Sequence, residues 1–157
     1  MLQKYLLIFF VSMVPLIELR GSIIMAVGMD LDYFTALTVS VIGNMLPVPL
    51  IYFFARNILV WGAHKPYIGK FFRFCLEKGE AAGKRLTDTT GRGGLFVALL
   101  LFVGIPLPGT GAWTGTLAAS FLNMGIKSTA AAVSLGVIMA GIIMGIASTC
   151  VFSVIGL

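Results

Sequence analysis

The chain has 157 residues, of which 59% are hydrophobic and only 11% are charged, against roughly a quarter charged in ordinary soluble domains. A soluble fold of this size has too little interior to hide so much apolar surface, so the sequence indicates an integral membrane protein. Residues 61–92 hold seven Lys or Arg and three acidic residues, so the net charge of +5 belongs mainly to one connecting segment. Nucleic acid is a poor explanation for charge placed in this way.

The sequence carries no recognisable enzyme or metal-site motif. It has neither a G-x-S-x-G nor an H-E-x-x-H pattern, and the glycines around Thr110 lack the lysine that completes a phosphate-binding loop. The lone His64 lies in the polar connector, and Cys75 and Cys150 are too far apart to suggest a disulfide or a metal site. We therefore expect no enzymatic activity, no cofactor and no metal.

The first apolar stretch, residues 5–29, is long enough to cross a bilayer but is broken at its centre. About 20 helical residues cross a hydrocarbon core of about 30 Å, and here Pro15 begins a polar break. With Lys4 in front, the stretch imitates a signal peptide. The break carries Glu18 and Arg20 where a cleavage site would need small residues, so we expect the segment to be retained.

The second stretch, residues 33–60, is a cleaner span, interrupted only by Pro47 and Pro49. We expect a kink or a short unwinding there, which serves either function or simple helix packing. Residues 61–93 form the basic connector, whose mixed aromatic and basic residues predict an amphipathic helix lying on anionic lipid; a plain solvated linker is the alternative. Because an excess of Lys and Arg marks cytoplasmic loops, we place the connector in the cytoplasm.

The third and fourth stretches follow the plan of the first two. Residues 94–122 are broken by two prolines and two glycines: Pro106, Pro108, Gly109 and Gly111. Two prolines and two glycines within six residues do not fit a continuous helix. Residues 128–155 carry no charge and no proline, which predicts a full span.

The recurring order of broken stretch, polar turn and span predicts one membrane domain, residues 1–157, built from an all-α repeat at 1–60 and another at 94–157. Irregular backbone at membrane depth is tolerated only where protein or a water-filled cavity surrounds it. Each broken stretch is therefore a re-entrant hairpin or a discontinuous helix that crosses. Half of one is about a dozen residues, or roughly 18 Å of helix, which reaches the bilayer centre and no further. We expect re-entrant hairpins, inverted repeats and both termini outside; full crossing would put both termini in the cytoplasm.

Glu18 and Arg20 are the strongest candidate site residues. A charge inside a membrane segment costs about 2.5 to 3.5 kcal/mol on insertion scales, so it persists where it pairs, lines a cavity or handles substrate. On extended backbone after Pro15 the two side chains can lie on one side, Glu18 as a proton carrier and Arg20 as an anion-binding group. The alternative is a permanent ion pair that joins the two halves. Aligning the prolines puts Gly109 and Gly111 opposite the charged pair, where they leave room for it to pack.

A second group of side chains can hydrogen-bond a polar ligand: Asn44, Thr110, Trp113 and Thr114. Broken helix ends also offer free backbone N–H groups to an anion. The residues that break the helices are Pro15, Gly21, Pro106, Pro108, Gly109 and Gly111. Small and polar residues are equally common in helix packing within membranes, which is the alternative for the second group and our interpretation of Gly141 and Gly145.

Three segments, residues 15–22, 43–49 and 106–115, resemble the small multidrug export protein family, which is held to be related to DedA-like (VTT domain) membrane proteins. The resemblance implies inverted repeats, each a re-entrant hairpin followed by a span. It further implies a link to proton-motive force and to phosphate-bearing polyprenyl lipids, served by membrane-embedded acidic and arginine residues. Glu18 and Arg20 would fill those roles by their position in the break.

The sequence therefore predicts a multi-pass, proton-coupled transporter of the cell (inner or plasma) membrane that moves an anionic or amphiphilic substrate such as a lipid phosphate. Arginine, threonine and helix ends suit an anion, whereas a cation beside Glu18 penalises a cationic substrate. Two alternatives stay open: an exporter of cationic drugs, as the family label suggests, and a membrane scaffold or chaperone whose Glu-Arg pair is only structural. Besides the lipid bilayer and the substrate, we expect a homo-oligomer and no nucleic-acid partner.

Overall fold

The computed structural model of the chain describes residues 1–15, 17–65, 69–107 and 109–155. Within these residues the chain is all-helical, as its sequence predicts, and forms no strand. The helices are α1 (Leu2–Met13), α2 (Glu18–Gly28), α3 (Tyr33–Met45), α4 (Pro47–Ala63), α5 (Gly69–Gly104), α6 (Ala112–Phe121) and α7 (Ile126–Ile155). Two helical stretches, Tyr33–Ala63 and Ile126–Val151, are long and apolar enough to cross a membrane.

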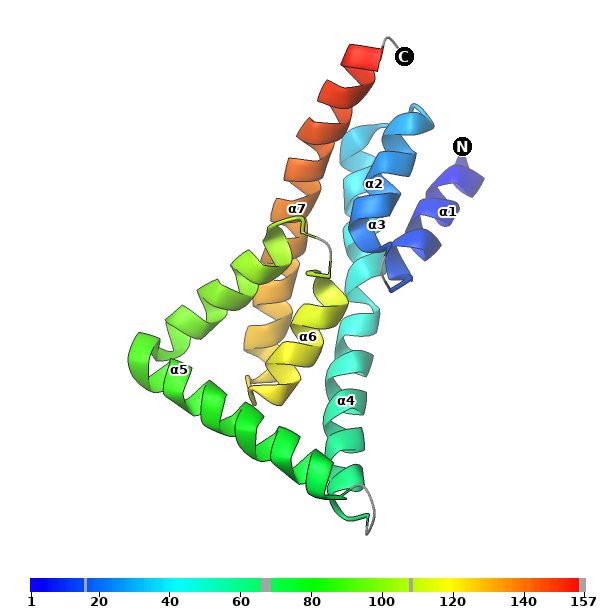
Figure 1. Ribbon diagram of the computed structural model, residues 1–157. Helices are drawn as coiled ribbons and strands as arrows, with labels where there is room; N and C mark the ends of the chain where they lie inside the picture. Colours follow the sequence, from blue (N-terminus) through cyan, green and yellow to red (C-terminus); the bar gives the residue numbers. More distant parts are fainter. Residues whose placement is uncertain (16, 66–68, 108, 156–157) are drawn as a thin grey trace.

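The first broken stretch folds back on itself. α1 ends before Pro15, which has no backbone N–H to continue a helix. Glu18 then begins α2 with a left-handed backbone (φ 50°), a conformation that few residues other than glycine adopt. α2 returns beside α1, and both pack on α3, where Ser22 Oγ and Ser40 Oγ are 2.8 Å apart. In Figure 1 the α1–α2 pair lies at the end of the molecule that carries the start of the chain and the end of α7.

The predicted span over residues 33–60 is two helices placed end to end (Figure 1). Only Leu46 separates α3 from α4, and it keeps helical angles of φ −62° and ψ −42°. Pro47 is the first residue of α4, where the missing N–H costs least. The prolines therefore cause a local break and not an unwound segment.

α5 is bent at Gly91, whose angles (φ 70°, ψ 173°) are accessible almost only to glycine. The bend divides the helix into a first arm, which lies in the predicted connector, and an apolar second arm, Gly91–Gly104. The first arm packs on protein: a Cβ added to Gly79 would lie 2.5 Å from the carbonyl oxygen of Phe121 at the end of α6. Residues 61–63 continue α4, and the connector from Gly69 onward is a packed helix instead of a solvated linker.

The two halves share the geometry of the turn that precedes the long span. After α2, Asp30 has a φ of 58°, and the Leu31 N–H donates to a carbonyl five residues back (3.0 Å). After α6, Asn123 has a φ of 56°, and the Met124 N–H makes the matching bond (3.0 Å). The equivalent residues are 93 positions apart in both pairs. Each half therefore ends its broken stretch with the same helix cap.

In each half, the helix that precedes the break also packs against a glycine of the long span. A Cβ added to Gly43 of α3 would lie 2.6 Å from the carbonyl oxygen of Phe9, and one added to Gly136 of α7 would lie 2.8 Å from that of Leu100. Such close backbone approach is typical of helix packing in membranes. The glycines are 93 residues apart, but Phe9 and Leu100 are 91 apart. The second break is therefore two residues longer than the first.

The last helix packs on α3 through small residues, as we predicted for Gly141 and Gly145. A Cβ added to Gly145 would lie 2.5 Å from Cζ of the Tyr33 ring, and one added to Gly141 would overlap Leu37. The Tyr33 hydroxyl donates to the Gly141 carbonyl oxygen (3.1 Å). The packing role of both glycines is confirmed. The two breaks meet near the middle of the molecule's length, beside the other end of α3 (Figure 1).

Candidate functional site

Glu18 binds the second break through its carboxylate. It is only 7% exposed, and its Oε2 and Oε1 accept hydrogen bonds from the backbone N–H groups of Ala112 (3.2 Å) and Trp113 (3.1 Å). These two groups open α6, where the first N–H groups have no partner inside the helix and the helix dipole favours negative charge. The carboxylate of the first half thus neutralises the positive end of a helix in the second half.

Gly111 makes this contact possible. It precedes α6, and a Cβ at this position would overlap Glu18 Oε2 and lie 2.7 Å from Glu18 Cδ. Gly109 serves another purpose: a Cβ there would meet nothing within 4 Å, but its φ of 82° favours glycine. Of the two glycines predicted to leave room for the charged break, one supplies space and the other supplies a backbone conformation.

Arg20 binds the loop that leads into α6. One guanidinium nitrogen donates to the carbonyl oxygen of Leu107, and the other donates to Thr110 Oγ1 (2.8 Å) and to the carbonyl oxygen of Ile105 (3.4 Å). The Thr110 hydroxyl lies 2.9 Å from both carbonyl oxygens. A planar guanidinium with several fixed donors suits such a set of acceptors. Arg20 therefore holds the second break in shape.

The structure corrects the predicted geometry of this pair in two respects. Glu18 and Arg20 do not lie on extended backbone, because α2 begins at Glu18; each reaches a different part of the second break. Within the described residues, no direct ion pair joins them. Because the second break is two residues longer, the structural counterparts of Glu18 and Arg20 are Gly111 and Trp113. The alignment on the prolines, which gave Gly109 and Gly111, holds only for the helices that precede the breaks, α1 and Gly91–Gly104.

Asn44 shares a small cavity with the charged pair. It is 1% exposed, and its Oδ1 is buried without a hydrogen-bond donor in the described part of the chain. The cavity, of about 10 Å³, is completed by apolar side chains and backbone. Its lining is Glu18, Leu19, Arg20, Asn44, Val103, Gly111, Ala112, Val137 and Ala140. A space of this size holds about one water-sized group and no larger ligand.

The other predicted site residues lie around this centre. The Trp113 indole Nε1 is buried with no acceptor among the described residues, and it belongs to an apolar groove between α4, α5 and α6. Thr114 is exposed, its hydroxyl donates weakly to the Gly111 carbonyl oxygen (3.4 Å), and it does not line the small cavity beside Glu18. A Cβ at Gly21 would overlap the Ile17 side chain.

Of the predicted helix breakers, Pro15 and Pro106 lie in the two breaks, and Pro108 lies outside the described residues. The residues that sequence reasoning missed act through backbone groups: the carbonyls of Ile105 and Leu107 and the N–H of Ala112. The proline-rich break does signal carbonyls without helical donors. It does not indicate which side chain reaches them.

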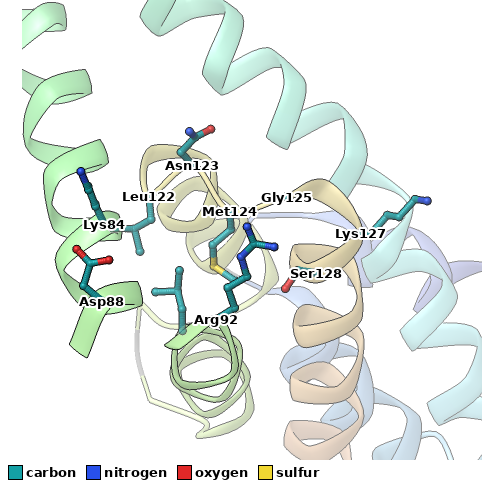
Figure 2. A pocket seen from close by; sticks show the side chains of 11 residues that line it. Lys84, Asp88, Arg92, Leu122, Asn123, Met124, Gly125, Lys127 and Ser128 are labelled. Atoms are coloured by element: carbon teal, nitrogen blue, oxygen red, sulfur yellow. The ribbon is translucent and has the colours of Figure 1, made fainter. Parts of the chain in front are cut away.

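A wider cavity of about 710 Å³ opens where the bend of α5 meets the start of α7. Figure 2 shows Lys84 and Asp88 on one side and Arg92 reaching upward between the arms, whereas Lys127 points away from them. Neither Lys84 nor Arg92 has a hydrogen-bond or ion-pair partner in the described part of the chain. The turn from Leu122 to Gly125 and the side chain of Ser128 complete the lining. The cavity is therefore lined by both polar and apolar side chains, is positively charged on balance, and is distinct from the centre around Glu18.

Comparison with protein families identifies the chain. The model of the family described as "Putative small multi-drug export protein" matches residues 18–143, which include the first break from Glu18 onward, the whole second break, the first long span and more than half of the second. The chain belongs to this family. Curated proteins and solved structures give no match. The family resemblance that the sequence suggests is thus confirmed, and together with the two apolar spans it makes the chain a membrane protein. The relationship to DedA-like proteins stays a prediction.

Proposed function

We propose that this chain is a proton-coupled transporter of an anionic or amphiphilic substrate such as a lipid phosphate. The observation that supports it most is the mutual binding of the two breaks, with Glu18 on the N-terminus of α6 and Arg20 on the preceding loop. Ionisable residues buried in membrane segments mark ion and substrate pathways, and interrupted helices in matching positions mark transport sites. The cavity beside Glu18 is too small for a substrate, so the described conformation is a closed one.

Two features support an anionic substrate over a cationic one. The groups that hold the Glu18 carboxylate are the positive end of α6 and, nearby, the Arg20 guanidinium, which both repel a cation. On the connector side, Lys84 and Arg92 face a cavity wide enough for a headgroup. An exporter of cationic drugs, which the family label suggests, would have to bind its substrate away from both places.

We propose further that the two broken stretches are re-entrant and the repeats inverted, with the connector in the cytoplasm and both termini outside. The α1–α2 pair lies at one end of the molecule, and the second arm of α5 with α6 approaches from the other (Figure 1). The matching turns and glycine contacts, 93 residues apart, support a repeat. The seven Lys or Arg of residues 61–92 support a cytoplasmic connector in the cell membrane.

A homo-oligomer would supply the pathway that one chain lacks. The described chain encloses only about 10 Å³ beside Glu18, and it leaves large apolar side chains exposed along α4 and α7, which are lipid-facing or subunit-facing in a membrane. The mass of the protein in lipid nanodiscs, measured by native mass spectrometry, distinguishes a homo-oligomer, with subunit-facing apolar surfaces, from a monomer whose apolar surfaces face lipid. A monomer in both lipid and detergent contradicts the oligomer.

The rival function is a scaffold or chaperone in which Glu18 and Arg20 only hold the halves together. Their hydrogen bonds to the second break favour a scaffold to the same extent as they favour a closed transporter. The two differ in Glu18→Gln. An amide keeps one acceptor oxygen and the shape of the side chain, so a transporter loses flux while the protein remains folded. A scaffold has no flux to lose and responds only in stability.

Flux through proteoliposomes tests the proposal directly. Purified protein is reconstituted, and uptake of a fluorescent alkyl phosphate and of a cationic dye is followed with and without an imposed pH gradient. We expect the alkyl phosphate to move faster with the gradient, the dye to be unaffected, and Glu18→Gln to remove the gradient effect. Gradient-driven movement of the dye alone supports the family label and contradicts our choice of substrate. Flux of neither probe contradicts the transporter.

A further inference from the structure

Asn44 presents a buried carbonyl oxygen with nothing to bind. Its Oδ1 has no donor among the described residues, although an unpaired buried acceptor costs about 1 to 3 kcal/mol. The residue lies one position before Met45 ends α3 and opens onto the small cavity that Glu18 also lines. Within the lining of that cavity, Glu18 and Arg20 are the titratable side chains. Arg20 already donates to the loop before α6, so a protonated Glu18 is a donor available to Asn44 from within the cavity that the two side chains share.

We propose that Asn44 is the second partner of the Glu18 carboxyl group and that the side chain alternates between two positions. Ionised, the carboxylate accepts from the N–H groups of Ala112 and Trp113, as the structure shows. Protonated, it turns into the cavity, and its O–H donates to Asn44 Oδ1. The proton enters as the carboxylate leaves α6, and it departs when the carboxylate returns. This inference rests on the proposed proton-coupled function.

The chemistry of an amide fits both positions. A carboxylate only accepts hydrogen bonds, whereas a carboxylic acid donates one and accepts others. A half-turn of the Asn44 amide exchanges its N–H₂ and its carbonyl oxygen, so one side chain can serve either form of Glu18. A leucine of similar size serves neither. Asn44 is thus a positioning residue, acting through Glu18 and not on the substrate itself.

The surroundings favour a proton over a metal cation at this place. From its own helix, Glu18 faces Arg20; from α6 it faces the backbone N–H groups; from α3 it faces Asn44. α5 contributes Val103, and α7 contributes apolar side chains without charge. The positive end of α6 and the guanidinium disfavour any added positive charge. A proton forms a covalent bond to the carboxylate, whereas a sodium ion would need several oxygen ligands, and the lining of the cavity offers side-chain oxygens only from Glu18 and Asn44.

Movement of Glu18 would open a site for the substrate. When the carboxyl group turns to Asn44, the N–H groups of Ala112 and Trp113 lose their acceptor, and the end of α6 is left without a counter-charge. A phosphate oxygen is the kind of group that binds such a helix terminus. Glu18 in its ionised form is then a built-in occupant of the anion site, and protonation exchanges it for substrate. Proton uptake and anion binding become two parts of one step.

Infrared spectroscopy of the purified protein in nanodiscs, recorded as a difference between acidic and neutral pH, tests the alternation without measuring transport. We expect a carboxylic-acid C=O band that Glu18→Gln removes. Asn44→Leu should shift that band to higher frequency, because the acid loses its hydrogen-bond acceptor, while the control Asn57→Leu, at an exposed asparagine of α4, should leave it in place. A band that Glu18→Gln removes but Asn44→Leu leaves unmoved overturns the proposal, as does the absence of a Glu18 band.

A second measurement covers the case in which Asn44→Leu does not fold. In the wild-type protein labelled with carbon-13 at the asparagine side-chain carbonyl, the labelled amide band should shift over the same pH range in which the Glu18 band appears, and Glu18→Gln should abolish that shift. A labelled band that stays constant overturns the proposal. If the bands are coupled but proteoliposomes show no flux, the switch stands and the proposed transport function fails.

Discussion

Replacing Gly111 by alanine adds one carbon at the contact that joins the two breaks. That carbon would overlap Glu18 Oε2 and lie 2.7 Å from Cδ and 2.8 Å from Oε1. The space beside the carboxylate is the cavity of about 10 Å³ that Asn44 also lines, so the added carbon displaces the carboxylate toward that cavity. The φ of Gly111 is 161°, which is extended backbone open to alanine, so the effect comes from the contact alone. The carboxylate must leave the N–H groups of α6.

The magnitude follows from the two hydrogen bonds that are lost. Hydrogen bonds to charged groups contribute about 1.5 to 3 kcal/mol each, so Gly111→Ala should lower the free energy of unfolding by about 3 kcal/mol or more. Gly93→Ala is the control, because a Cβ at Gly93 meets nothing within 4 Å. Unfolding is followed by helical circular dichroism in mixed micelles of increasing denaturing detergent. Equal stability of the two alanine variants refutes the reasoning.

A double-mutant cycle sharpens this test. In a Glu18→Ala background there is no carboxylate to displace, so adding Gly111→Ala should cost little more. If the loss in that background equals the loss in the wild type, Gly111 acts on the backbone and not through Glu18.

Four other predictions concern separate parts of the fold. Arg20→Lys replaces a fork of donors by a point charge and should lower stability by about 1 to 2 kcal/mol in the same denaturation assay; equal stability would show that the loop carbonyls do not depend on the guanidinium. Gly91→Ala forces a side chain onto glycine-only angles and should cost about 1 to 3 kcal/mol, unlike Gly93→Ala. Combined Lys84→Gln and Arg92→Gln should weaken binding of octyl phosphate, measured by calorimetry in a neutral detergent, and unchanged affinity excludes the wide cavity as an anion site. A reporter after α7 that is active only outside the cytoplasm should be active, and the reverse result overturns the re-entrant topology.

Much of the fold follows from simple features of the sequence. The long apolar spans, the breaks at Pro15 and Pro106, and the packing glycines of α7 each rest on a local rule: length, a missing N–H or a missing side chain. The position of the bend in α5 is harder to predict from the sequence. Gly91 and Gly93 look alike in sequence, and only the tertiary position of the first arm against α6 decides which of them takes a conformation reserved for glycine.

Sequence reasoning selects the residues of the candidate site but not the contacts that they make. The cost of a charge in a membrane singles out Glu18 and Arg20 without any structure. Apart from the Thr110 hydroxyl, their partners are backbone groups, which every residue carries, so no residue type reveals them. The two additional residues of the second break also shift the pairing from Gly109 to Gly111. Such a shift is invisible when two halves are aligned on one proline.

The central claim is that protons and an anionic substrate move together through the Glu18 site. The most direct test uses proteoliposomes loaded with a pH-sensitive dye. An alkyl phosphate is added outside without an imposed pH gradient, and the lumenal pH is recorded. We predict a substrate-driven change in lumenal pH with the wild-type protein and none with Glu18→Gln. Alkyl phosphate entry without a pH change, or an equal pH change in Glu18→Gln, would contradict the account.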